Sequence, residues 1–353
     1  MTKQKVAVLA GVLALAAAGV AALILLQPGK PVSRSDFLMD TLMEQSLSGR
    51  EAQQASDRIA QTLRELDARL DRYDPDSEIA AVNAAAGREG VAVSADTYAL
   101  LKRAVELAEQ TGGVFDPTIG PVTALWHDAK EAGVPPQEAE IARCLDLVDY
   151  RDIRFDDDAQ TVMLAREGMS LDLGGIAKGY ASDLVKEICE EADIDAALVS
   201  LGGNVYCHGV SAAGKQGHRI GIRDPQAEDG SPLLALTLTD QVLATSAAYE
   251  RYFEYEGTTY HHIIDPATGF PADSDLLSVT VISPDGTLAD CLSTTLYIEG
   301  MTAVEEIISR QEAGEALSFS LVAIDRTGTV YLSPALRDTV VLFEDKESQY
   351  HLA

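Results

Sequence analysis

The sequence lacks the patterns that mark several common classes of protein. Its four cysteines are widely spaced and form no Cys-x-x-Cys pair, which argues against a zinc site. It contains no internal repeat and no glycine-rich loop of the usual nucleotide-binding type. It is also poor in positive charge, with 27 Lys and Arg against 56 Asp and Glu and a formal net charge of −29. Because such a surface repels polyanions, we expect no nucleic-acid partner.

The chain does contain enough apolar material for a large core. Of its 353 residues 46% are hydrophobic, so it can form one large or two ordinary domains. Patterns typical of strands and of helices occur in blocks and not in strict alternation, which predicts an α+β fold. Since no internal segment has the composition of a linker, we expect a single domain over residues 30–353, preceded by a separate segment, residues 1–29.

The N-terminal segment carries a long apolar run. Lys3 and Lys5 precede the 21 uncharged residues 6–26, which as a helix would span about 30 Å, the thickness of a bilayer core. The apolar region of a cleaved signal peptide is shorter, about 7–15 residues, so an uncleaved anchor is favoured over a cleaved signal. With the lysines in front, we predict a single-pass protein of the cell membrane whose main domain is extracytoplasmic.

Hydrophobic periodicity predicts the main elements of that domain. Apolar residues at helical spacing indicate a helix over residues 56–70, and Ser94 can cap the next one. Further helices are expected near 176–191, 287–299 and 302–312. Strands are expected in the ranges 152–173, 196–201, 219–223, 233–238 and 276–282, with hairpins at Glu256-Gly257 and Arg326-Thr327-Gly328.

Asp290 and Thr294 form the first candidate site. In a helix, residues four apart lie on one face, so this carboxylate and hydroxyl would be neighbours. Together with a carbonyl from a glycine turn they would suit Mg²⁺, which prefers oxygen ligands and acts on phosphates. The alternative is a solvated Asp and a Thr bonded to its own helix, and for an isolated pair that alternative is favoured.

Two further segments suggest chemistry. Residues 172–179 (Asp-Leu-Gly-Gly-Ile-Ala-Lys-Gly) place two glycines between a strand and a helix, where backbone N–H groups and Lys178 could hold an anion. The alternative is a glycine turn required for packing. His262, three residues before Asp265 in a loop shaped by Pro266 and Gly269, could be a carboxylate-held general base or a structural histidine.

Seven ordered motifs make the chain resemble the FAD:protein FMN transferases, the ApbE-type flavin transferases. The resemblance covers about Met39 to the C-terminus. Its landmarks are Tyr73 with Ser77-Glu78-Ile79 and Asn83; Gly112 to Pro121; Asp172 to Gly179; Leu201-Gly202-Gly203-Asn204; Ala244-Thr245-Ser246 before Tyr249-Glu250-Arg251; His262 to Pro266 with Thr268-Gly269; and Ala289-Asp290 with Ser293-Thr294.

This resemblance implies a site, which we state as an expectation. His262 would be the base. FAD would be held by Met39, Tyr73, Val114, Phe115, Asp116, Asp172, Lys178 and Ile264. Mg²⁺ would be bound by Gly175 through its carbonyl, Asp290, Ser293 and Thr294. The implied fold is a single α+β flavin transferase domain related to the T-fold, exported or tethered to the membrane.

The implied activity is Mg²⁺-dependent cleavage of the FAD pyrophosphate. FMN would pass to a Ser or Thr of an exported acceptor protein belonging to a respiratory or redox complex, and AMP would be released. Two alternatives stay open: hydrolysis of FAD to FMN and AMP, and an extracytoplasmic flavin-binding protein without turnover. The chain also departs from the family pattern at two positions. It has Met39-Asp40-Thr41 where the family usually has Met-Gly-Thr, and Ala247 where a glycine commonly follows Thr-Ser.

Overall fold

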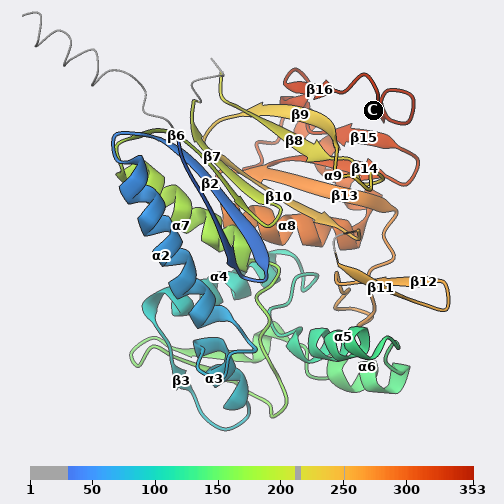
Figure 1. Ribbon diagram of the computed structural model, residues 1–353. Coiled ribbons are helices and arrows are strands. Elements are labelled where there is room, and N and C mark those ends of the chain that lie inside the picture. The colour runs from blue at the N-terminus through green and yellow to red at the C-terminus, as the bar shows by residue number, and fades with distance from the viewer. Residues whose placement is uncertain (1–30, 211–215, 250) are drawn as a thin grey trace, which may run out of the picture.

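A nine-stranded, almost wholly antiparallel sheet forms the centre of the molecule (Figure 1). The computed structural model describes residues 31–210, 216–249 and 251–353. Only the last pair of the sheet, β15 with β17, is parallel. The strands, in sheet order, are β1 (Val32–Leu38), β2 (Thr41–Gly49), β6 (Ile194–Leu201), β7 (Asn204–Gly209), β10 (Gln241–Ala247), β13 (Leu276–Ser283), β14 (Ser320–Asp325), β15 (Thr329–Leu332) and β17 (His351–Leu352).

Helices cover one face of this sheet and a second sheet covers the other. In β10, Val242 and Ala244 face the helices, while Leu243 packs toward the second sheet. Both faces are therefore apolar, as the alternation of side chains along a strand requires. The helices are α2 (Ala52–Leu70), α7 (Ala177–Glu191), α8 (Gly286–Glu299) and α9 (Met301–Glu312), and the second sheet consists of β8 (His218–Arg223), β9 (Pro232–Leu238) and β16 (Val340–Leu342).

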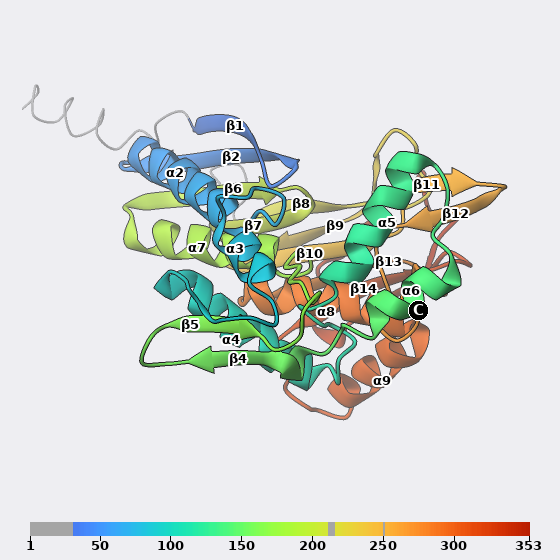
Figure 2. The ribbon, with the colours of Figure 1, turned by 90° about the horizontal axis from the view of Figure 1, so that it is seen from below.

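The remaining elements form a layer beneath the helices in the view of Figure 1, and a projecting hairpin (Figures 1 and 2). Helix α5 runs close to the hairpin of β11 and β12, and Trp126 of α5 stacks on Tyr260 of β12 with ring centroids 5.4 Å apart. The bounds are α3 (Glu78–Ala84), β3 (Val91–Ala92), α4 (Ala95–Gln110), α5 (Gly120–Ala132), α6 (Glu138–Leu145), β4 (Ile153–Asp156), β5 (Thr161–Leu164), β11 (Tyr252–Tyr255) and β12 (Thr258–His261), with short 3-10 turns at Tyr150–Asp152 and Pro334–Leu336.

The predicted mixed helix–sheet fold is confirmed, and most predicted helices lie where periodicity placed them. Ser94 caps α4 by accepting from Thr97 N, as expected. Helix α2 begins at Ala52, four residues before the predicted start, because Ala52 and Ala55 extend its buried stripe. The sequence patterns did not reveal β1, β2, β7 or β10. The first two form a hairpin whose two-residue loop, Met39-Asp40, adopts positive φ angles of 51° and 56°.

No helix in the described ranges is long and apolar enough to cross a membrane. The predicted anchor, residues 6–26, lies outside those ranges.

Candidate active site

A cavity of about 920 Å³ is lined by residues of α7, α8 and the β11–β12 hairpin, among other segments. It falls within the range of roughly 300–1,000 Å³ typical of ligand pockets. All but one of the predicted site residues line it, although they come from six separate segments. They are Met39, Tyr73, Val114, Phe115, Asp116, Asp172, Gly175, Lys178, His262, Ile264, Asp290 and Thr294. The exception is Ser293, which is fully buried behind the wall.

Two helices hold Asp290 by capping each other. The carboxylate of Asp290, on α8, accepts a hydrogen bond of 2.8 Å from Gly179 N at the amino end of α7. In return Asp183, on α7, accepts from Gly286 N at 2.6 Å and Thr287 N at 2.8 Å at the amino end of α8. Each carboxylate thus meets the positive end of the other helix dipole. The anion site predicted at the start of α7 is therefore partly filled by Asp290 itself.

The crossing depends on Gly179. A Cβ atom there would lie 2.2 Å from Gly286 O and 2.6 Å from the Cβ of Asp290, well inside contact distance. We expect Gly179→Ala to force α8 outward, to lower the free energy of unfolding by about 1–3 kcal/mol, and to impair any activity that needs Asp290. Thermal unfolding checks this, with Glu187→Ala on the exposed side of α7 as the control. A variant as stable as the parent would contradict the packing argument.

Thr294 lies one helical turn after Asp290 and also faces the cavity. Burial raises the pKa of the Asp290 carboxyl, while the positive charge of Lys178 and backbone N–H groups lower it. The described residues contain no group of three or more His, Cys, Asp or Glu that would form a complete metal cage. A cation here would need further ligands from a substrate, which is how Mg²⁺ is usually held beside phosphates. The donor set, one carboxylate and one hydroxyl in a cavity that Gly175 also lines, fits Mg²⁺.

The two adjacent histidines differ in what their ring nitrogens do. In His261 both are engaged: Nε2 lies 3.0 Å from Ala272 O, and Nδ1 accepts from Ile263 N at 3.2 Å. In His262 only Nδ1 is engaged, 3.3 Å from the carbonyl of Arg251. A carbonyl can only accept, so Nδ1 carries the proton and Nε2 has a free lone pair. Of these two, His262 is therefore the histidine that can accept a proton in the cavity.

The predicted partner of His262 was wrong. The carboxylate of Asp265 accepts from Ala267 N at 2.8 Å and from the hydroxyl of Thr268 at 3.2 Å, and so organises its own turn. Burial of His262, with the positive charge of Arg251 and Lys178, lowers its pKa to about 4, although hydrogen bonding to Arg251 O opposes this. The ring is open to the cavity but surrounded by protein, so it stays neutral at physiological pH.

Asp172 holds an arginine that sequence reasoning missed. Its carboxylate accepts from Arg72 at 2.8 Å, from the hydroxyl of Thr123 at 2.6 Å and from Gly174 N at 2.8 Å. Burial would raise the pKa of Asp172, but Arg72 and these hydrogen bonds outweigh it and hold the pKa below its usual range. The guanidinium of Arg72 also lies 5.3 Å from the ring centre of Tyr73. The only sequence signal for Arg72 was its place directly before Tyr73.

The 114–116 loop lines the cavity, but the Asp116 carboxylate points inward to the protein. It accepts from Thr118 N at 2.8 Å, from the hydroxyl of Thr118 at 2.6 Å and from Tyr150 N at 2.9 Å. Burial raises the pKa of Asp116. Its carboxylate therefore shapes the loop, and the ring of Phe115 packs against Gly175. Neither Gly174 nor Gly175 has a positive φ, so close packing explains these glycines.

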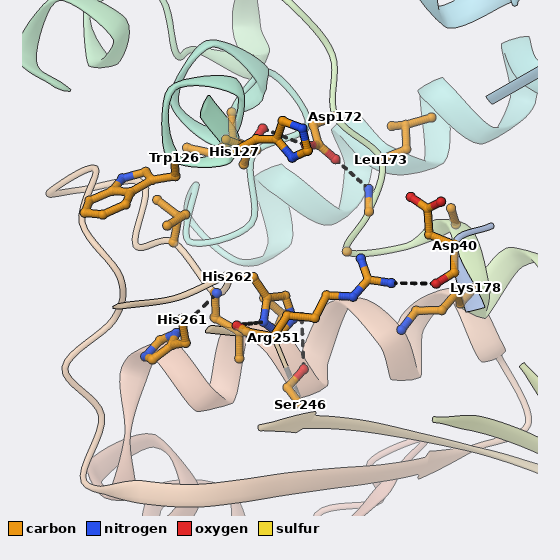
Figure 3. A pocket seen from close by; sticks show the side chains of 18 of the residues that line it. Asp40, Trp126, His127, Asp172, Leu173, Lys178, Ser246, Arg251, His261 and His262 are labelled. Carbon is orange, nitrogen blue, oxygen red and sulfur yellow. Dashed lines mark hydrogen bonds between the residues drawn. The ribbon is translucent and has the colours of Figure 1, made fainter. Parts of the chain in front are cut away.

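The cavity is charge-balanced in an acidic protein. Within the described residues its wall contains five basic side chains and five acidic ones. The whole chain has a net charge of −29. Figure 3 shows Arg251 extended from beside His262 to Asp40, where its guanidinium donates to the backbone carbonyl at 3.1 Å. The ten residues are Arg72, Lys130, Lys178, Arg223 and Arg251 with Asp40, Asp71, Asp116, Asp172 and Asp290.

A mixed helix–sheet domain with a large cavity, an available imidazole and a buried carboxylate is an enzyme-like arrangement. The model of the ApbE family matches residues 39–318. A FAD:protein FMN transferase of Treponema pallidum is 36% identical over 284 residues, 76% of this chain and 78% of that protein. The chain therefore belongs to the ApbE family.

Solved structures agree with this assignment. The ApbE protein of Thermotoga maritima has a TM-score of 0.75 at 30% identity, covering 91% of this chain and 99% of that one. The flavin transferase ApbE of Vibrio cholerae has a TM-score of 0.75 at 27% identity, covering 88% of this chain and 99% of that one. The similarity therefore extends over almost the whole described fold.

Proposed function

We propose that this protein is an FAD:protein FMN transferase. One observation carries the proposal: His262, with a free Nε2, lines the same cavity as Asp290 and Thr294. A binding protein needs no proton acceptor beside a phosphate-binding wall. The names of the relatives, FAD:protein FMN transferase, support the same activity.

The reaction needs a proton acceptor and a grip on a diphosphate. Nε2 of His262 would take the proton of a Ser or Thr hydroxyl as that oxygen attacks the phosphorus of the FMN half. The bond from this phosphorus to the bridging oxygen breaks, and AMP leaves with that oxygen and the electron pair. The products are the FMN ester of the acceptor and AMP. Lys178 and Arg251, which line the cavity, would hold phosphate oxygens, and Tyr73, 56% exposed, would offer a ring face for stacking.

Mg²⁺ is part of the proposal. Asp290, Thr294 and the Gly175 carbonyl would hold it, and when bound it would neutralise charge that develops on the diphosphate. Ser293, whose hydroxyl donates to Asp290 O at 2.9 Å, would support this group from behind. The charge balance of the cavity wall supports this proposal. Acidic and basic side chains are equal in number there, so an anionic dinucleotide with a bound cation would not meet a negative surface.

An assay with the purified full-length chain can distinguish FMN transfer, FAD hydrolysis and flavin binding without turnover. It is incubated with FAD, Mg²⁺ and an acceptor domain carrying a Ser or Thr flavinylation sequence. Flavin fluorescence that stays with the denatured acceptor on a gel, together with stoichiometric AMP, supports transfer. Free FMN with AMP and no labelled acceptor would instead indicate the pyrophosphatase, and unchanged FAD would indicate a flavin-binding protein.

The location and partners are further proposals. Residues 6–26 would anchor the chain in the membrane, with residues 30–353 forming one extracytoplasmic domain. The acceptors would then be exported proteins of respiratory or redox complexes, because a tethered enzyme meets substrates on that side. A relation of the domain to the T-fold remains a prediction from the family resemblance.

The hairpin loop at the cavity offers a specific prediction. Asp40 lines the cavity and has a φ of 56°, in a loop of the kind that favours glycine. Asp40→Gly removes one carboxylate near an anionic substrate, so we expect the KM for FAD to fall several-fold, on the order of 1 kcal/mol. Stability should change by less than about 1 kcal/mol, because relief of the left-handed backbone and the added freedom of glycine oppose each other.

Asp40→Asn is the matched control for this change, since asparagine keeps the turn preference but removes the charge. Steady-state kinetics with FAD should show the same lower KM for both variants. A KM unchanged in Asp40→Asn would show that the charge of Asp40 does not act on the substrate.

A further inference from the structure

A chain of hydroxyl groups runs behind Thr294. Ser246, on β10, lies 2.9 Å from the hydroxyl of Ser293 and 3.1 Å from the hydroxyl of Thr294. Ser293 in turn lies 2.9 Å from the backbone carbonyl of Asp290. Ser246 is the member of this chain that comes from the sheet, and it lines the cavity (Figure 3). The chain therefore connects β10 to Asp290 and Thr294, the two polar residues of α8 that line the cavity.

The carbonyl end fixes the direction of every proton in this chain. A carbonyl oxygen only accepts, so the single proton of Ser293 points to Asp290 O. Ser293 must then accept from Ser246, whose own proton is used in doing so. Ser246 can only accept from its other partner, so the proton of Thr294 points to Ser246. The lone pairs of the Thr294 oxygen are not used within this chain of hydroxyl groups, so they can accept from or bind another partner.

Thr294 departs from the usual behaviour of a helical threonine. The next residue, Thr295, donates its hydroxyl back to Cys291 O at 2.9 Å, the common arrangement inside a helix. Thr294 makes the sheet-directed hydrogen bond to Ser246 instead. Without Ser246, its hydroxyl would be free to rotate and donate to its own helix or to water. The side chain on β10 therefore decides how this oxygen is presented.

We propose that Ser246 is a positioning residue that turns the Thr294 hydroxyl into an obligate acceptor, and so into a ligand for a hard divalent cation. This rests on the proposed function, in which a cation is held by Asp290 and Thr294. Residues that orient metal ligands from behind typically change metal affinity by 10–100-fold when they are replaced. Ser246 would act on the cation only through Thr294 and would make no contact with the acceptor hydroxyl.

The test measures Mn²⁺ binding to the full-length protein by electron paramagnetic resonance, with FAD present and no acceptor. We expect Ser246→Ala to weaken Mn²⁺ binding by 10–100-fold and to raise the Mg²⁺ concentration needed for half-maximal transfer, with kcat at saturating Mg²⁺ largely kept. Ser246→Thr retains the hydroxyl and should restore affinity. Thr295→Val, which removes a hydroxyl from the same helix away from the cavity, should leave Mn²⁺ affinity unchanged.

A double-mutant cycle separates an effect through Thr294 from a general structural one. In a Thr294→Val background, Ser246→Ala should cause no further loss of Mn²⁺ affinity. Equal affinities of Ser246→Ala and the parent protein, or fully additive losses in the double variant, would overturn the proposal. If the parent protein bound no cation with FAD, the metal-dependent function would fail instead, which is a different result.

Discussion

Replacement of Asp290 by alanine is expected to abolish metal-dependent transfer. The carboxylate is the only acidic group beside Thr294 on the described cavity wall of α8. Loss of a group that supports several kcal/mol of transition-state stabilisation corresponds to a fall in kcat/KM of about 10³-fold or more. The measurement is AMP release against Mg²⁺ concentration, combined with Mn²⁺ binding.

Asp290 also has a structural task, so a second variant is needed. Its carboxylate accepts from Gly179 N, and alanine would leave that buried donor without a partner. Asp290→Asn keeps an oxygen at this position and removes the charge. We expect it to retain most of the stability of the parent protein but not its cation affinity. Full activity in Asp290→Asn would remove Asp290 from the proposed metal site, and Glu305→Ala, exposed on α9, controls for loss of an unrelated charge.

Replacement of His262 by glycine is expected to slow transfer by about 10²–10⁴-fold, the usual contribution of a general base. The affinity for FAD, measured by quenching of flavin fluorescence, should change little. The imidazole is proposed to accept a proton and not to contribute much binding energy. Imidazole added to the medium should restore part of the activity by occupying the vacated space. His351→Ala, exposed on β17, is the control. Loss of FAD binding in step with activity would make His262 a structural residue.

The same histidine is expected to set the acid side of the pH profile. A base is active in its neutral form, so activity falls as pH drops through its pKa. Burial, with Arg251 and Lys178 as positive neighbours, lowers the pKa of His262 to about 4. The rate of transfer should therefore stay constant as the pH falls below 6.5, the ordinary pKa of histidine, and should decline only toward pH 4. A decline centred at pH 6.5 or above would show that the ring is not desolvated during the reaction.

The sequence by itself identified the residues that we propose for the chemistry. Asp290, Thr294 and His262 belong to short segments whose residue types and spacing already suggested oxygen ligands and a base. Helical periodicity likewise predicted α2, α7 and α8, because an amphipathic stripe is a local property. Strands β7 and β10 escaped notice because strands buried on both faces lack the alternation that reveals a half-exposed strand.

Only the tertiary structure decided how these residues act on one another. Asp265 is close to His262 in sequence, but a backbone carbonyl of Arg251 fixes the tautomer. Arg72 meets Asp172 across a separation of 100 residues. Ser246 reaches Thr294 only because β10 packs on α8. Hydrogen-bond direction and helix crossing depend on distances between segments that no local pattern encodes, whereas residue type and periodicity are written in the chain itself.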